Sequence, residues 1–491
     1  MTDKQKPLIM EEKTVKRTAI LPVCTITEVC EKDDPRAIQQ VIHKMDGISA
    51  DIPYFIRPVL APDETRGFNY NLFPVVLDHN AVPWDIASIY ILSRLQATEY
   101  PEMATFAGIA DDLGAYKEFL DEKSDIDFTD FPQNKLKRPT YRYNGFLKQK
   151  LFAGEVEPST VKRRMSSVVA FYRWLIQEGI LSPANDPWQE REYLASFKTA
   201  EGFKMSKAVK STDLAIKAPV KDVPHEGTIL DGGRLRPLPQ TEQLWVLEAL
   251  SHLGNTELTL IHLIALLTGA RIQTVLTLRV SHVLRNYPAS VTKVSITCGP
   301  GYGVDTKNDV VGVLQVPQQL YNLLHAYAKS ARSQNRRAKA PGGDTESQYL
   351  FLTQQGTPYY QAKIERMQFN PDLRIRHQKK GQTVRQFITD HVIPYVQTHH
   401  DPNFHYRFHD LRASFGMNET DRQLDLVEQG KIKLSDARRH VQKLLWHASS
   451  ATTDLYLDYR RQMEMVWAAV DGYEAHIATL IEAAKAGGFN E

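Results

Sequence analysis

Apolar residues recur at three- and four-residue steps along most of the chain and alternate with polar residues over only a few short stretches. The clearest helical pattern follows Pro158, where Ser159 or Thr160 could cap the first turn and Gly179 could end the helix. Residues three and four apart share one face of a helix, so one face would be buried. That face would hold Val161, Met165, Val168, Val169, Tyr172 and Ile176.

The second half of the chain contains a second regular region. A nearly all-apolar run over residues 258–268 predicts a buried helix. Residues 291–297 and 310–316 have the composition of two strands, with turn residues between them. Helical patterns then return, and Ser435 could cap one of these helices. The sequence therefore predicts a mainly α fold with a small antiparallel sheet, which is an α+β class.

The length of 491 residues exceeds one ordinary hydrophobic core and indicates several domains. Residues 1–85 are predicted to be an N-terminal extension of unknown role, with a short hairpin over 73–84. Residues 86–196 are predicted to form a helical domain. Residues 197–237 have little apolar periodicity and contain Gly and Pro, so we expect a basic linker there. Residues 238–491 would form the other domain, with a helical C-terminal tail.

The composition excludes several classes of protein. Hydrophobic residues make up 42% and charged residues 24%, as in soluble globular proteins. The longest apolar stretch, over residues 258–270, is too short to span a bilayer, and residues 1–16 are too polar for a secretory signal. Three cysteines make no disulfide framework, and Cys24 and Cys30 lack partners at zinc spacing. We expect a cytoplasmic protein without a membrane partner.

Positive charge is concentrated locally, although the net charge is only +2. Residues 135–164 contain nine Lys or Arg and two Glu, which suits contact with a phosphate backbone but also a solvated helix face. The predicted linker carries six lysines and could either track a duplex or act as a spacer. The candidate DNA-contacting residues are Lys162, Arg163, Arg173, Lys204 and Lys207.

Five residues spread along the chain suit phosphodiester chemistry without a metal ion. Breaking such a bond requires cations around the phosphorus, a nucleophile, and an acid for the leaving oxygen. The arginine fork binds two phosphate oxygens, and the hydroxyl of tyrosine can attack phosphorus and later leave again. The five candidates are Arg271, His409, Arg412, His447 and Tyr456.

These candidates lie in three short motifs. Arg271 ends the string Thr-Gly-Ala-Arg after the predicted buried helix. His409 and Arg412 frame the string His-Asp-Leu-Arg, and Tyr456 follows His447 by nine residues with two threonines between them. Taken singly, each motif also fits a structural role, such as a surface arginine, a structural histidine or a core tyrosine beside Tyr459. Their joint order and spacing resemble the active site of the tyrosine recombinases, the lambda-integrase family.

This resemblance implies an integrase of a phage or other mobile element that cleaves and rejoins DNA strands through a 3′-phosphotyrosine intermediate. The family uses no cofactor or metal, and it assembles a homo-tetramer on double-stranded DNA that carries a specific recombination site. An accessory or directionality factor and a place at the bacterial nucleoid would also be expected. Residues 86–196 would be the core-DNA-binding domain, and residues 238–491 the catalytic domain. In this family, a lysine in a β-hairpin is the acid for the 5′ oxygen. Lys307 matches the position of that lysine, and Lys293 is the alternative.

Three features depart from the family pattern. Thr274 stands where an acidic residue is common, and Trp446 stands where glycine usually precedes the histidine. The longer gap between Arg412 and His447 predicts an inserted helix or loop over residues 419–433. None of these departures removes a reacting group.

Two other functions fit the same residues. A type IB topoisomerase-like enzyme uses similar chemistry as a monomer on one duplex. An architectural DNA-binding protein with a decayed active site would bind DNA tightly and form no covalent complex. The intact set of five residues argues against decay.

Overall fold

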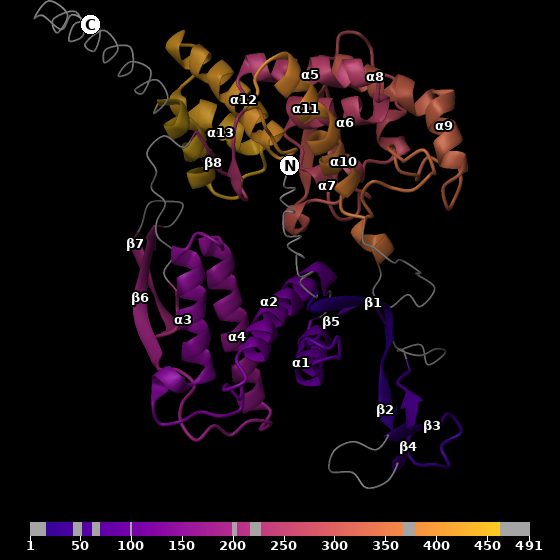
Figure 1. Ribbon diagram of the computed structural model, residues 1–491. Helices are drawn as coiled ribbons and strands as arrows, with labels where there is room; N and C mark the ends of the chain where they lie inside the picture. Colours follow the sequence, from indigo (N-terminus) through magenta and orange to yellow (C-terminus); the bar gives the residue numbers. More distant parts are fainter. Residues whose placement is uncertain are drawn as a thin grey trace, which may run out of the picture. The chain divides into compact units, whose positions relative to one another are not determined.

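The computed structural model shows a chain divided into two compact units (Figure 1). Of the described residues, the first unit contains those up to 216 and the second unit those from 227 onward. The predicted fold class is confirmed, because both units are mainly helical and carry small antiparallel sheets. Among the described residues, no helix combines the length and apolar character needed to cross a bilayer. The structure describes residues 16–42, 52–60, 69–98, 101–198, 204–216, 227–366 and 379–461.

Four helices form the body of the first unit: α1 (Asp85–Gln96), α2 (Met103–Glu122), α3 (Pro139–Phe152) and α4 (Pro158–Gln177). Helix α4 contacts the other three (Figure 1, purple). A short 3-10 turn, η1 (Lys135–Lys137), precedes α3.

Helix α4 confirms the predicted buried face and corrects its start. Val161, Met165, Val168, Val169 and Tyr172 are buried, whereas Ile176 is 37% exposed. The helix begins at Pro158 with Glu157 as its N-cap, so neither Ser159 nor Thr160 caps it. The reason is that the fixed φ of proline suits the first helical position. Gly179 follows the C-terminus with φ 69°, as predicted.

Part of the predicted N-terminal extension shares the core of this helical bundle. Strand β1 (Thr18–Thr25) pairs antiparallel with β5 (Asn69–Val76), and β5 buries apolar side chains against α1 and α2. The expected turn is present, since the Asp78 carboxylate accepts hydrogen bonds from the backbone of Asn80 and Val82. The strand paired with β5 is nevertheless β1, and only an isolated bridge joins Leu77 to Pro83. A second sheet has the order β2 (Thr27–Val29), β4 (Ile52–Pro58), β3 (Ile38–Ile42).

The segment predicted as a linker, residues 197–237, contains the second strand of one hairpin and the whole of another. Strands β6 (Glu190–Lys198) and β7 (Lys204–Thr212) pair antiparallel in the first unit. Strands β8 (Ile229–Leu230) and β9 (Arg234–Leu235) pair in the second unit. Among the described residues, the division between the two units falls between residues 216 and 227, inside the segment predicted as a linker.

The second unit is built around helix α6 (Thr256–Thr268), which is the predicted buried helix. It contacts α5 (Gln240–Leu253), α8 (Gln318–Lys329) and α12 (Asp410–Glu428). The two predicted strands are present as β10 (Lys293–Cys298) and β11 (Gly312–Pro317), paired antiparallel. Shorter elements complete the unit: α7 (Ile272–Leu276), η2 (Val280–Val283), η3 (Lys307–Asp309), α9 (Ala331–Ala338), η4 (Lys363–Arg366), α10 (Gln382–Phe387), the π-helical turn η5 (Ile388–Val392), α11 (Ile393–His399) and α13 (Leu434–Leu444).

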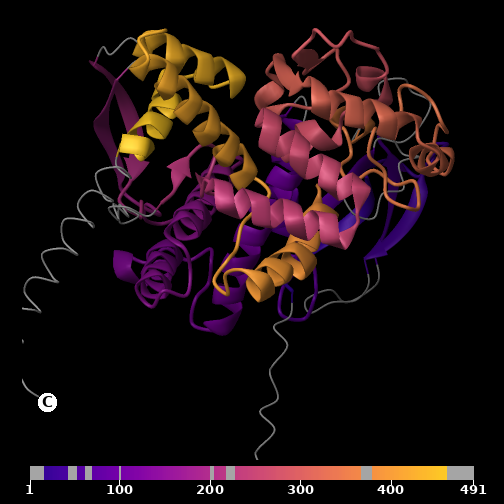
Figure 2. The same cartoon turned by 90° about the horizontal axis from the view of Figure 1, so that it is seen from above.

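The extra length between the second arginine motif and the following histidine is helical. Helix α12 continues to Glu428, Gly430 turns the chain with φ 68°, and α13 returns along α12 (Figure 2, gold). The N-cap of α13 is Lys433, so the predicted cap at Ser435 is wrong. A further helical segment over residues 450–461 follows. The predicted C-terminal tail lies outside the described residues.

Candidate active site

The carboxylate of Asp231 lies at the centre of the predicted site, at the tip of the β8–β9 hairpin. Its Oδ2 accepts hydrogen bonds from Arg412 Nε at 2.7 Å and from the Tyr456 hydroxyl at 3.2 Å, and it lies 3.1 Å from His447 Nε2. Its Oδ1 accepts from Arg271 Nη2 at 3.3 Å. Four of the five motif residues thus contact one carboxylate, although they lie 40 to 225 residues from it in sequence.

The end of helix α6 positions Arg271. Gly269 takes the left-handed φ of 69°, and a Cβ there would lie 2.5 Å from the ring of Phe415. Only glycine therefore ends the helix here without strain or overlap. Burial, together with the nearby Arg412, lowers the pKa of Arg271 to about 10. Its Nε is buried and has no hydrogen-bond partner among the described residues.

Backbone carbonyls hold Arg412 in a fixed orientation. Its Nη1 donates to the carbonyl of Gly269 at 2.7 Å, and its Nη2 donates to that of Leu445 at 2.6 Å. The side chain is 3% exposed. Because both outer nitrogens are bound to the backbone, Nε is the group that faces the Asp231 carboxylate.

His409 is the N-cap of α12, so the His-Asp-Leu-Arg string lies over the first turn of this helix. Burial lowers the pKa of His409 to about 4, and the positive charges of Arg412, Arg271 and Lys307 contribute in the same direction. The imidazole is therefore neutral near pH 7.

His447 is held between a hydroxyl and a carboxylate. Its Nδ1 lies 3.0 Å from the Thr453 hydroxyl, and its Nε2 lies 3.1 Å from Asp231. The preceding Trp446 has φ 51°, a left-handed conformation that glycine adopts more readily. The indole Nε1 donates to the carbonyl of Val313 at 3.2 Å, and the ring covers Gly312, which leaves no room for a Cβ there.

Tyr456 is fully buried in the helical segment over residues 450–461. Its ring lies against Gly416 of α12, where a Cβ would overlap it. Burial raises the pKa of Tyr456 above its usual value, and Asp231 adds to the rise. An ion pair of Asp454 with Arg438 ties this segment to α13.

Lys307 lies in the loop between β10 and β11, close to the hairpin tip that carries Asp231. A Cβ on Gly232 would lie 2.7 Å from its Nζ. The loop is anchored by Asp305, whose carbonyl accepts from the Thr274 hydroxyl at 2.9 Å and whose amide donates to Thr277 at 2.9 Å. The Thr274 hydroxyl therefore helps to hold the loop that carries Lys307.

Lys293 lies at the opposite end of the β10–β11 ladder. It pairs with Pro317, whereas Cys298 pairs with Gly312 at the loop end. Its charge acts on Glu419, whereas the charge of Lys307 acts on His409. The structure thus brings Lys307 to the other predicted site residues and leaves Lys293 away from them.

No protein-family model and no curated protein matches this chain. The chain is similar in fold to solved site-specific recombinases. The XerH recombinase bound to a palindromic difH substrate is 13% identical, with 80% of this chain and 91% of that chain covered and a TM-score of 0.43.

Two further solved structures have comparable scores. The Tn1549 transposon integrase in complex with a circular intermediate DNA is 13% identical, covering 78% of this chain and 98% of that chain, with a TM-score of 0.43. A lambda integrase dimer bound to a COC′ core site is 12% identical, covering 77% of this chain and 95% of that chain, with a TM-score of 0.40.

Reasoning from the sequence missed Asp231. The string Asp-Gly-Gly signals a turn, and the left-handed φ of 71° at Gly232 agrees with it. Nothing in the neighbouring sequence shows that this carboxylate contacts two arginines, a histidine and a tyrosine from distant segments.

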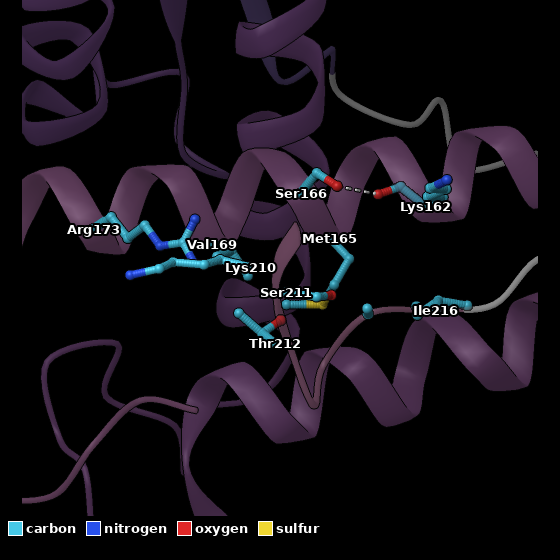
Figure 3. A pocket seen from close by; sticks show the side chains of 10 residues that line it. Lys162, Met165, Ser166, Val169, Arg173, Lys210, Ser211, Thr212 and Ile216 are labelled. Carbon is cyan, nitrogen blue, oxygen red and sulfur yellow. Dashed lines mark hydrogen bonds between the residues drawn. The ribbon is translucent and has the colours of Figure 1, made fainter. Parts of the chain in front are cut away.

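The predicted DNA-contacting residues of the first unit lie on helix α4 and strand β7. Lys162 and Arg173 are exposed on α4 and, with Lys210 of β7, line a pocket of about 220 Å³ (Figure 3). Arg163 instead pairs with the buried Asp112 at 3.0 Å, and Arg173 also pairs with Glu190 at 2.8 Å. Lys204 and Lys207 lie in β7, and their side chains lie outside the described residues.

Proposed function

We propose that the second unit is the catalytic domain of a tyrosine site-specific recombinase, an integrase that moves a mobile element. The observation that supports this proposal is the convergence of Arg271, Arg412, His447 and the Tyr456 hydroxyl on one anionic group. Cations around a buried anion, with a hydroxyl within hydrogen-bond distance, are what an in-line attack on a phosphodiester needs.

In the proposed reaction, the scissile phosphate takes the position between the two arginines and His447. The Tyr456 oxygen attacks phosphorus and its proton passes to His409, which is neutral near pH 7. The bond from phosphorus to the 5′ oxygen breaks, and Lys307 protonates that oxygen. The product is a 3′-phosphotyrosine link, which stores the bond energy so that a 5′ hydroxyl of a partner strand can reverse the step.

Binding and assembly complete the proposal. The exposed cations Lys162 and Arg173 of α4 would contact the duplex backbone beside the recombination site, with Lys204 and Lys207 of β7. Because strand exchange joins two duplexes, four copies of the chain would assemble in the synaptic complex, aided by an accessory factor that sets direction. A topoisomerase-like enzyme would need neither matched partner sites nor a tetramer.

The test is a covalent-adduct assay on a nicked suicide duplex, whose sequence comes from the flanks of the encoding element. Wild-type protein should form a denaturant-stable adduct that maps to Tyr456. Tyr456→Phe should form none while it binds the same duplex almost as tightly, because only the attacking oxygen is lost. Tyr459→Phe is the matched control and should keep the adduct.

Three outcomes count against the proposal. An adduct that persists in Tyr456→Phe would point to Tyr459 as the nucleophile. Tight binding without an adduct in the wild-type protein would favour the architectural function. Relaxation of supercoiled DNA that lacks partner sites, without strand exchange, would favour the topoisomerase function.

A further inference from the structure

The Asp231 carboxylate occupies the position that the proposed mechanism gives to the scissile phosphate. It carries a negative charge, and its two oxygens accept hydrogen bonds from Arg271, Arg412 and Tyr456, with His447 also in contact. The two non-bridging oxygens of a phosphodiester would accept hydrogen bonds from the same donors. One oxygen, Oδ2, is shared by three of these side chains, and both the carboxylate and Arg412 are 3% exposed.

One buried donor of the site is left unpaired by the carboxylate. Arg271 Nε is buried without a hydrogen-bond partner among the described residues, although the same guanidinium reaches Asp231 through Nη2. An unsatisfied buried donor costs free energy, so such groups are usually paired in the state that a site is built for. A phosphodiester has more oxygens than a carboxylate, and one of them could accept from this nitrogen.

We propose that Asp231 is a built-in competitor for the scissile phosphate, which fills the active site of the free protein and must leave it before DNA is cleaved. This inference rests on the proposed function of the same site. Two anions cannot share these donors, because the carboxylate and the phosphate would repel each other at close range without solvent between them. The phosphate can therefore bind only when the Asp231 carboxylate leaves the site.

The hairpin tip allows this exchange without unfolding its base. Ile229 and Leu235 are each 2% exposed and anchor the two strands in the second unit. Between them, Gly232 and Gly233 have φ values of 71° and 154°, which glycine can change at low cost. A change of side-chain rotamer at Asp231, with a small shift of these glycines, would clear the site.

A role for Asp231 as the base that takes the Tyr456 proton fits the structure less well. Burial raises the pKa of Asp231, but the hydrogen bond with His447 and the charges of Arg412 and Arg271 outweigh burial and hold that pKa well below its usual range. A carboxylate so strongly stabilised in its charged form is a weak proton acceptor. The two roles also predict opposite effects of removing the charge.

The first experiment measures binding of inorganic phosphate to the full chain by isothermal titration calorimetry. Asp231→Asn should bind phosphate at least about tenfold more tightly than wild type, since the anion no longer competes with a resident carboxylate. The matched control is Asp390→Asn, the same change at an exposed position of η5, which should bind phosphate as wild type does. Equal affinity in Asp231→Asn and wild type would overturn the proposal.

Thermal unfolding covers the case of a poorly folded variant. Loss of Asp231 leaves two arginines facing each other, so Asp231→Asn and Asp231→Ser should both melt at lower temperature in phosphate-free buffer. Added phosphate should raise the melting temperature of both variants by more than that of wild type. A variant whose melting temperature phosphate does not restore would show that Asp231 is an ordinary structural ion pair.

Adduct formation on the suicide duplex separates this inference from the proposed function. Asp231→Asn should form the Tyr456 adduct at least as fast as wild type at limiting duplex, whereas loss of the adduct would support the base role. If neither wild type nor Asp231→Asn forms an adduct while phosphate still binds more tightly to the variant, the proposed function is refuted. The inference that Asp231 competes with a bound anion is then still supported. If wild type forms the adduct but Asp231→Asn binds phosphate no more tightly than wild type, the proposed function stands and the competing role of Asp231 is refuted.

Discussion

Replacement of Arg412 by lysine would test how the site holds its anion. The guanidinium makes three separate bonds: Nη1 to Gly269, Nη2 to Leu445 and Nε to the anion. A lysine ammonium is a single point with three donors, so it cannot reach two carbonyls on one side and an anion on the other. The variant keeps the positive charge and loses the fixed orientation.

The size of the effect follows from these contacts. Removing one donor that stabilises developing charge costs about 2.7–4 kcal/mol, or 10²–10³-fold in rate. We therefore expect Arg412→Lys to cleave at least about 10²-fold more slowly. The two carbonyls left without a donor would each destabilise the folded protein by about 1–3 kcal/mol.

The measurement is the single-turnover cleavage rate on the suicide duplex, read on a denaturing gel well below the melting temperature of the variant. Arg422→Lys is the matched control, because Arg422 lies on the same helix and pairs with Glu419 outside the site. Cleavage by Arg412→Lys within threefold of wild type would refute the reasoning, since a charge alone would then be sufficient.

Two further predictions concern protons. Lys307→Ala should cleave ordinary DNA much more slowly than wild type. Its cleavage rate should recover on DNA with a sulfur in place of the 5′ bridging oxygen, because a thiolate leaves without an acid. Lys293→Ala should cleave both substrates as wild type does. No recovery with sulfur, or a defect in Lys293→Ala, would move the acid elsewhere. In the folded protein the pKa of His409 is lowered to about 4, so as the pH falls the unfolded chain takes up this proton before the folded chain does. Protonation of the unfolded chain therefore lowers the free energy of unfolding as the pH falls from about 6.5 to 4. His409→Gln should reduce that loss by about 1–3 kcal/mol in chemical denaturation at several pH values, and an unchanged pH dependence would place His409 in solvent.

Local periodicity was sufficient to predict the helices that matter most. The buried faces of α4 and α6 follow from apolar spacing alone, and the β10–β11 pair follows from alternation around a turn. These features depend on residues close together in sequence, where the pattern and the structure have the same period. Capping was less predictable, because Glu157 and Lys433 precede α4 and α13 without side-chain caps.

Long-range pairing could not be read from the sequence. Strand β1 finds its partner β5 across the intervening β2–β4 sheet, and no spacing rule encodes that choice. The motif residues could be located in the sequence because their order is distinctive. In the structure, four of the five contact the Asp231 carboxylate, and their catalytic roles stay predictions. Asp231 carries no motif at all, and only the folded chain shows which side chains it contacts.

Trp446 connects two parts of the candidate site that are far apart in sequence. Its indole binds the backbone of β11, and the next residue is His447. Holding a tryptophan at φ 51° costs about 1–2 kcal/mol, which a glycine at this position would avoid. In return, the hydrogen bond ties the β10–β11 ladder, whose loop carries Lys307, to the residue before His447, so the position of the loop and that of the histidine depend on each other.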